Sequence, residues 1–208
     1  MMASALSVFL VSAFILAITP GPGMLYVLTR SIKGGRSEGY ASSLGTAIGG
    51  VFHVVAAALG ISAILAASSV AYHLVKYIGA GYLIFLGVRT LLRRSEAHEV
   101  ESVSSGGAWP ALRQGILTEI LNPKTALFFL AFIPQFVDPQ GSVPLQFMVL
   151  GTISVCLNTS ADLVVATLAG PIGTMLQQRR KMREAQRVFS GATLIALGVY
   201  AAASGDKS

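Results

Sequence analysis

The stretch AITPGPGMLYV, residues 17–27, interrupts a run of apolar residues that would otherwise form a membrane helix. Pro20 and Pro22 each remove a backbone donor, and Gly21 and Gly23 weaken the helical conformation. In hydrocarbon, the backbone groups freed by such a break need partners in protein, water or a ligand. The stretch therefore predicts a helix that is broken inside the bilayer, with backbone N–H and C=O groups that are free to bind protein, water or a ligand.

The composition of the 208-residue chain is typical of an integral membrane protein. Only 12% of its residues are charged and 53% are hydrophobic, whereas a soluble domain carries roughly 25% charged residues. About twenty apolar residues cross a bilayer. We expect an all-α membrane protein, one domain over residues 1–208, with six transmembrane helices. The predicted spans are 5–28, 40–66, 70–92, 114–136, 145–168 and 188–204.

The basic residues predict the orientation in the membrane. Twelve of the fifteen Lys and Arg residues lie in or beside three connections: the one after span one, the one between spans three and four, and the one between spans five and six. Positive charge in short connections marks the cytoplasmic side, so both termini are expected on the outer face of a bacterial inner membrane. We interpret cations such as Arg30 as topology anchors that contact lipid headgroups. Despite the net charge of +6, no polar domain carries a basic face, so nucleic acid is not an expected partner.

The sequence carries no pattern for metal binding or catalysis. Cys156 is the single cysteine, and the three histidines are scattered, so neither a disulfide nor a metal site is predicted. No nucleophile elbow, phosphate loop or HExxH motif occurs, and we expect no enzymatic activity and no cofactor. The polar, Ser- and Gly-containing segment 93–112 is interpreted as a cytoplasmic linker.

The two halves of the chain, residues 4–92 and 113–204, resemble each other. Each half contains three spans, so the second copy enters the membrane from the opposite side. Such inverted repeats place the substrate site of transporters near the bilayer midplane. The matching pairs are TPG at 19–21 with NPK at 122–124, GTAIGG at 45–50 with GTISVC at 151–156, and GYLIFLGV at 81–88 with GATLIALGV at 191–199.

The two proline breaks come to the same depth. Pro20 lies ten residues before Arg30, and Pro123 lies ten residues after Arg113. At about 1.5 Å per residue, each break is about 15 Å from the cytoplasmic boundary. We expect a shared cavity there, lined by free backbone amides and carbonyls. The alternative is that each proline only kinks a helix for packing.

At TPGPGMLYVLTRSIKGGRSEGYASSLGTAIGG, residues 19–50, and at LTEILNPKTALFFLAFIPQFV, residues 117–137, the chain resembles the LysE/RhtB family of amino-acid exporters. Its overall pattern is closer to the homoserine/threonine branch than to the lysine-exporting branch. The resemblance implies export of amino acids or close derivatives, driven by the proton-motive force. The motif positions that it marks are Pro20, Gly21, Pro22, Asn122, Pro123 and Lys124.

Two positions depart from the family pattern. Relatives commonly carry Asp or Asn where this chain has Gly23, and Asn where this chain has Glu119. A polar group is thus missing from the first break, and a carboxylate is added near the second. We still expect Gly23 at the substrate site.

Four ionisable residues inside the predicted spans are functional candidates, because charge is costly in hydrocarbon. We expect Lys124 to bind the substrate carboxylate with the N–H groups after Pro123; the alternative is a permanent ion pair with Asp162 or Glu119. Glu119, about 6 Å nearer the cytoplasm, is expected on the inner access route or in the interface, with a part in proton coupling. His53 is expected to be an interhelical hydrogen bonder, with a proton relay as the alternative.

The fourth candidate, Asp162, lies four residues after Asn158, so both side chains are on one helical face. We expect this pair to bind the substrate ammonium and Asp162 to carry the coupled proton. The alternative is that Asp162 is a fixed counter-ion of Lys124.

The leading hypothesis is a proton-coupled exporter of small, neutral or hydroxylated amino acids that works by alternating access. The alternatives are a passive facilitator or channel for a small solute, and an exporter of basic amino acids. Metal export is disfavoured by the scarcity of Cys and His within the spans. The expected partners are the amino acid, protons and lipid, and a thin bundle of six helices suits a homodimer.

Overall fold

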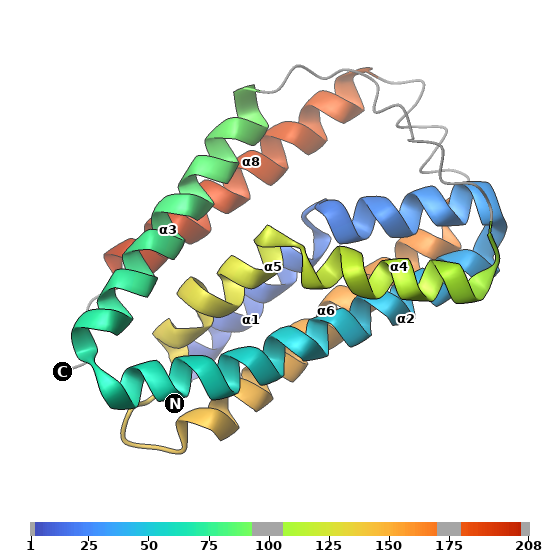
Figure 1. Ribbon diagram of the computed structural model, residues 1–208. Helices are drawn as coiled ribbons and strands as arrows, with labels where there is room; N and C mark the ends of the chain where they lie inside the picture. The colour runs from blue at the N-terminus through green and yellow to red at the C-terminus, as the bar shows by residue number, and fades with distance from the viewer. Residues whose placement is uncertain (1–2, 93–105, 170–179, 205–208) are drawn as a thin grey trace.

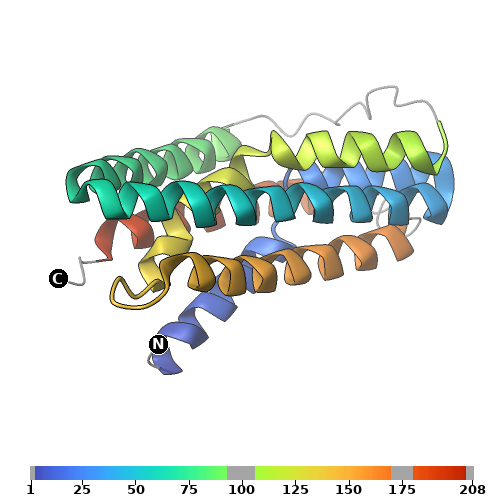
Figure 2. The same cartoon turned by 60° about the horizontal axis from the view of Figure 1, so that its bottom comes forward.

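The computed structural model describes residues 3–92, 106–169 and 180–204, and every regular element in these ranges is helical. The longer helices lie roughly along one common direction, whereas the helix at the N-terminus crosses them obliquely, as Figure 2 shows. The all-α prediction is confirmed. In chain order the elements are α1 (Ala3–Ile18), α2 (Pro22–Ala67), α3 (Ser69–Leu92), α4 (Ala108–Ile120), α5 (Pro123–Leu127), the π-helical turn η1 (Phe128–Phe132), the 3-10 turn η2 (Ile133–Phe136), α6 (Val143–Thr167) and α8 (Arg180–Ala203).

Three helices are long and apolar enough to cross a membrane. They are Pro22–Ile61 within α2, Val70–Leu92 in α3 and Val143–Thr167 in α6. A fourth span arises if α4 and the segment Pro123–Phe136, bent by 42° at the second break, count as one. The apolar part of α1, Ala5–Ile18, is shorter. The described residues thus contain three or four candidate spans, and the count of six stays a prediction.

The long helix α2 consists of two arms that meet at Gly35. This glycine has a φ of +74° and a ψ of −175°, a conformation that side chains disfavour. Figure 1 shows the chain reversing at this point, so that the two arms of α2 run in opposite directions. The connection expected between the first two spans, residues 29–39, is therefore helical apart from this turn.

The helices pack as neighbouring pairs. α2 packs against α4 and α6, and α3 lies beside α8 in the opposite direction (Figure 1). Glycines allow the close approach of α3 and α8: a Cβ on Gly87 would lie 2.7 Å from the carbonyl oxygen of Gly191. A Cβ on Gly198 would likewise lie 2.7 Å from the carbonyl oxygen of Ala80. Small residues of this kind are the usual means of tight helix contact in membranes.

An aromatic cluster holds the segment after the second break against α1. The rings of Phe128 and Phe132 lie 5.0 Å apart, and those of Phe132 and Phe136 lie 5.1 Å apart. Phe9 of α1 meets Phe136 edge-on at 5.4 Å. All four side chains are almost completely buried. The cluster therefore packs η2, and through its stacked rings η1, against α1.

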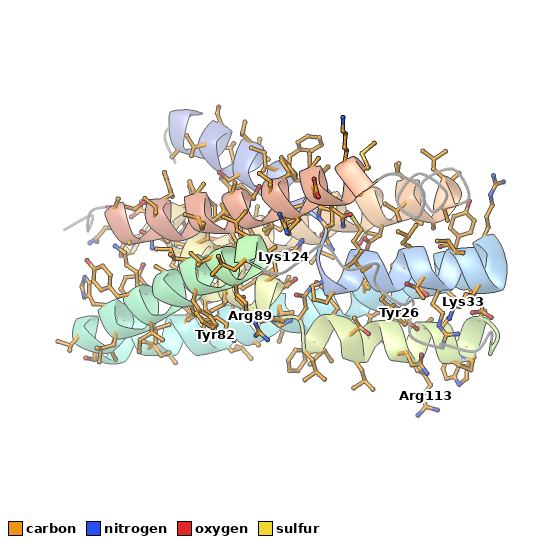
Figure 3. All side chains as sticks on the ribbon, turned by 90° about the horizontal axis from the view of Figure 1, so that it is seen from above. Tyr26, Lys33, Tyr82, Arg89, Arg113 and Lys124 are labelled. Carbon is orange, nitrogen blue, oxygen red and sulfur yellow. The ribbon has the colours of Figure 1, made fainter. Side chains whose placement is uncertain are left out.

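Two sequence-based interpretations change. Arg30 is not available to headgroups, because it is 2% exposed and pairs with Glu38 across the Gly35 turn at 3.0 Å. Arg113, in contrast, extends outward from α4 (Figure 3). The range 93–112 is also not wholly a linker, since α4 begins at Ala108; residues 93–105 lie outside the described part of the chain.

Candidate functional site

The first break separates α1 from α2 as the prolines predict. α1 ends at Ile18, and Pro22 occupies the first position of α2, where a missing N–H has no cost. The N-cap residue Gly21 is extended, with a φ of −142° and a ψ of −177°. Because the chain leaves the helix here, carbonyls in the last turn of α1 lose their partners along the helix.

The second break separates α4 from α5. α4 ends at Ile120, and Pro123 occupies the first position of α5. Asn122 caps α5, because its side-chain oxygen accepts a hydrogen bond from the backbone N–H of Lys124 at 3.1 Å. Both breaks lie near the middle of the bundle along its length (Figure 1), as the sequence spacing predicts.

Lys124 reaches from the second break to the first. Its Nζ donates to the carbonyl oxygens of Leu16, at 3.1 Å, and Thr19, at 2.8 Å. A cation suits this end of α1, where the helix dipole places negative charge. No ion pair joins Lys124 to Glu119 or Asp162 in the described part of the chain. An ammonium has three N–H groups, and these two bonds use two of them.

Glu119 lies inside the protein, at the end of α4. It is 1% exposed. Its Oε2 accepts a hydrogen bond from Asn122 Nδ2 at 3.0 Å, and its Oε1 accepts one from Thr125 Oγ1 at 2.6 Å. Both partners belong to the second break and flank Lys124 in the sequence. They hold the Glu119 carboxylate in place, and it does not pair with Lys124.

The glycines of the first break abut the charged residues of the second. A Cβ on Gly21 would lie 3.1 Å from Cδ and Cε of Lys124. A Cβ on Gly23 would lie 2.5 Å from Oε2 of Glu119. The carbonyl oxygen of Pro20, also in the first break, accepts a hydrogen bond from Ser190 of α8 at 3.2 Å. The PGPG and NPK motifs therefore form one site.

Asp162 does not line the cavity between the two breaks, but it is hydrogen-bonded to Thr46, which does. It is 1% exposed, and its Oδ2 accepts a hydrogen bond from Thr46 Oγ1 at 2.8 Å. Its Oδ1 has no hydrogen-bond partner among the described residues. Asn158, on the same helix, lines the cavity between the breaks, whereas Asp162 is linked to that cavity through Thr46.

His53 makes the interhelical hydrogen bond that the sequence predicts. Its Nε2 lies 2.9 Å from the carbonyl oxygen of Glu119, at the end of α4. Because a carbonyl oxygen only accepts, this nitrogen is the donor. The imidazole also stacks on Phe129, with ring centroids 6.0 Å apart. His53 thus satisfies a carbonyl next to the second break.

A small cavity lies between the two breaks. Its volume is about 30 Å³, which holds a water molecule but is far below the roughly 300–1,000 Å³ of small-molecule sites. The site is therefore closed in this conformation. Within the described ranges, no three His, Cys, Asp or Glu side chains are grouped to hold a metal ion. The polar residues that line the cavity are Thr46, Glu119, Lys124, Thr125, Ser154, Asn158 and Thr159.

Sequence reasoning missed two polar residues. Thr46, the donor to Asp162, is an ordinary hydroxyl residue in an apolar span, and no sequence signal marks it. Lys76 is 2% exposed, and its Nζ donates to the carbonyl oxygen of Ser204 at the end of α8. The rule that selected Lys124 would have found Lys76 as well, since it lies within the predicted span 70–92.

The fold and the site define a helical membrane protein in which two broken helices meet at a buried, charged cavity. Residues 14–205 match the family model described as LysE type translocator, and the chain belongs to this family. The family resemblance noted from the sequence motifs is thus confirmed.

Several curated relatives match most of the chain. The chain is 26% identical to a homoserine/homoserine lactone efflux protein of Salmonella typhi, over 94% of this chain and 95% of the relative. It is 32% identical to a leucine efflux protein of Enterobacter sp. (strain 638), over 69% of each. It is 34% identical to an uncharacterized membrane protein of Pseudomonas aeruginosa, over 85% of this chain and 82% of the relative. No solved structure matches the chain.

Proposed function

We propose that this protein exports small amino acids of the neutral or hydroxylated kind, such as threonine or homoserine, across the bacterial inner membrane. Membership of the LysE type translocator family supports this assignment. Two relatives of related sequence are named for efflux of homoserine or its lactone and of leucine. The polar lining contributed by Ser154, Asn158 and Thr159 suits a substrate with a small polar side chain.

The observation that carries the proposal is the hydrogen bonding of Lys124. Two backbone carbonyls hold its ammonium at the cavity, so one N–H is left to donate to the carboxylate of an amino acid. Glu119 lines the same cavity and Asp162 does not, so we assign the negative charge that the substrate ammonium needs to Glu119 instead of the Asn158–Asp162 pair expected from the sequence. A zwitterion therefore finds one charged group for each of its ends.

The small cavity supports export by alternating access. An amino acid is too large for a volume of about 30 Å³, so the broken helices must separate to admit it from one side and release it on the other. Asp162 carries the coupled proton, because its buried Oδ1 has no partner in the described structure and its Oδ2 is linked to the cavity through Thr46.

Six spans arranged as an inverted repeat are part of this proposal. The corresponding spans of the two halves pack against each other: α3 against α8, and α2 against α6. Both termini then face the periplasm or the cell exterior. Single cysteines at residues 69 and 141 in a Cys156→Ala background test this topology. Labelling of either cysteine from outside supports it, and labelling from the cytoplasm contradicts it.

The test of function is efflux from loaded bacterial cells that express the protein. Threonine, homoserine, serine, leucine, lysine and arginine are compared, with and without a protonophore. Uphill efflux of the neutral or hydroxylated amino acids, abolished by the protonophore and by Lys124→Met, is the expected result. Downhill efflux that ignores the protonophore indicates a facilitator, and preference for lysine or arginine indicates an exporter of basic amino acids.

A further inference from the structure

Gly23 lies against the end of a charged side chain, which would have to move if residue 23 carried a Cβ. The gap between a Cβ at this position and Oε2 of Glu119 would be 2.5 Å, a separation that real Cβ atoms essentially never show. Gly60, in the same helix, has no heavy atom within 4 Å of such a Cβ. Gly23 also has no positive φ. What glycine provides at this position is therefore space, not an unusual backbone conformation.

The Glu119 carboxylate is enclosed on its other sides. Asn122 Nδ2 donates to Oε2 at 3.0 Å, and Thr125 Oγ1 donates to Oε1 at 2.6 Å. His53 binds the backbone carbonyl of the same residue at 2.9 Å. The bare Cα of Gly23 completes this enclosure. A side chain at residue 23 would push Oε2 away from Asn122 and change where the carboxylate faces the cavity.

We propose that Gly23 is a positioning residue that sets where the Glu119 carboxylate meets the substrate ammonium, and thereby determines how tightly an amino acid is bound. The role rests on the proposed function, since the ammonium is that of the exported amino acid. Gly21 has a weaker version of this role toward Lys124, because its Cβ would lie 3.1 Å from the nearest lysine carbons. The two glycines thus fit the first break to both charges of the second.

The same geometry allows the carboxylate to be supplied from the other break. The carboxyl carbon of an aspartate lies about 1.5 Å beyond its Cβ. An aspartate at residue 23 therefore reaches the position that Oε2 of Glu119 now occupies. With Glu119→Gly removing the original group, Gly23→Asp returns one carboxylate to one place. Gly23→Asp alone places two carboxylates at this position, where they repel each other. Glu119→Gly alone leaves no carboxylate there.

Transport in proteoliposomes tests the role of Gly23. We expect Gly23→Ala to raise the KM for threonine or homoserine at least about tenfold, the effect of losing one hydrogen bond to a charged group, with a smaller change in maximal rate. Gly60→Ala is the matched control and should leave both constants unchanged. We also expect each of Gly23→Asp and Glu119→Gly to weaken transport, and the double variant to recover it.

Thermal unfolding in detergent separates this role from the proposed function. Alanine is the better helix former, so a glycine without a contact should gain stability on substitution. We expect Gly23→Ala to lower the unfolding midpoint in the unsubstituted protein but not in Glu119→Gly. If Gly23→Ala behaves like Gly60→Ala in both assays, or the double variant is no better than the worse single one, the role is overturned. If the unsubstituted protein exports no amino acid, the proposed function fails, and the unfolding comparison still decides the contact.

Discussion

Two buried charged clusters in this protein are built in opposite ways. In the first, which we call the Arg30 cluster (Tyr26, Arg30, Glu38 and Gln114), Arg30 pairs directly with Glu38 at 3.0 Å. Its other nitrogens donate to Gln114 at 2.6 Å and to Tyr26 at 3.1 Å. In the second, which we call the central site (Glu119, Lys124 and Asp162), the three charged groups have only neutral hydrogen-bond partners.

The difference separates charges that pair with each other from charges that, in the function we propose, bind the substrate or the coupled proton. The Arg30 cluster joins both arms of α2 to α4, and Glu38 also accepts a hydrogen bond from the backbone N–H of Gly107 at 2.7 Å. Its charges are neutralised by each other. At the central site the charged groups do not form ion pairs with each other. In our proposal, the carboxylate and the ammonium of a zwitterion supply the opposite charges.

The largest expected effect on folding comes from breaking the Arg30 cluster. Glu38→Gln leaves Arg30 buried without its counter-ion, which we expect to lower the free energy of unfolding by about 3–5 kcal/mol. Thermal unfolding in detergent measures this loss. Arg36→Met, at an exposed position in the same turn, is the control and should change little. An equal effect of the two substitutions would show that the Arg30–Glu38 pair does not stabilise the Gly35 turn of α2.

At the central site the largest expected effect is on transport. Lys124→Met removes the ammonium that we assign to the substrate carboxylate, so efflux should fall by about two orders of magnitude, the equivalent of about 3 kcal/mol of lost binding. The carbonyls of Leu16 and Thr19 also lose their donor, and some stability is lost with them. Efflux rates per folded molecule separate the two effects. Normal transport by this variant would show that Lys124, like Arg30, stabilises the fold and does not bind the substrate.

The contrast between the clusters also shows what could be predicted from the sequence. Both breaks followed from Pro20 and Pro123, because proline is tolerated in the first turn of a helix but disrupts its interior. The ionisable candidates followed from the rarity of charge in apolar segments. Their partners did not follow. Lys124 binds carbonyls more than a hundred residues earlier in the chain, at Leu16 and Thr19, and such contacts depend on how the helices lie in space.

A smaller change is expected at Asp162. Asp162→Asn keeps the shape of the side chain and an oxygen that accepts the hydrogen bond from Thr46, so the free energy of unfolding should change by no more than about 1 kcal/mol. Coupling should be lost, because an amide does not take up and release a proton. Downhill efflux should then continue while uphill efflux stops. Uphill efflux by this variant would assign proton coupling to another group.

The smallest expected effect concerns His53, whose imidazole hydrogen-bonds a backbone carbonyl instead of a charged group. Gln offers an amide N–H to the same carbonyl, so His53→Gln should cost about 1 kcal/mol of stability or less and leave uphill efflux intact. His53→Leu, which has no donor, leaves the Glu119 carbonyl short of a partner and should be the less stable of the two. Uphill efflux that is lost in both variants, with stability retained in His53→Gln, would instead make His53 a proton relay. The comparison thus decides whether this imidazole is a neutral hydrogen-bond donor at the central site or one of the groups that carry the coupled proton.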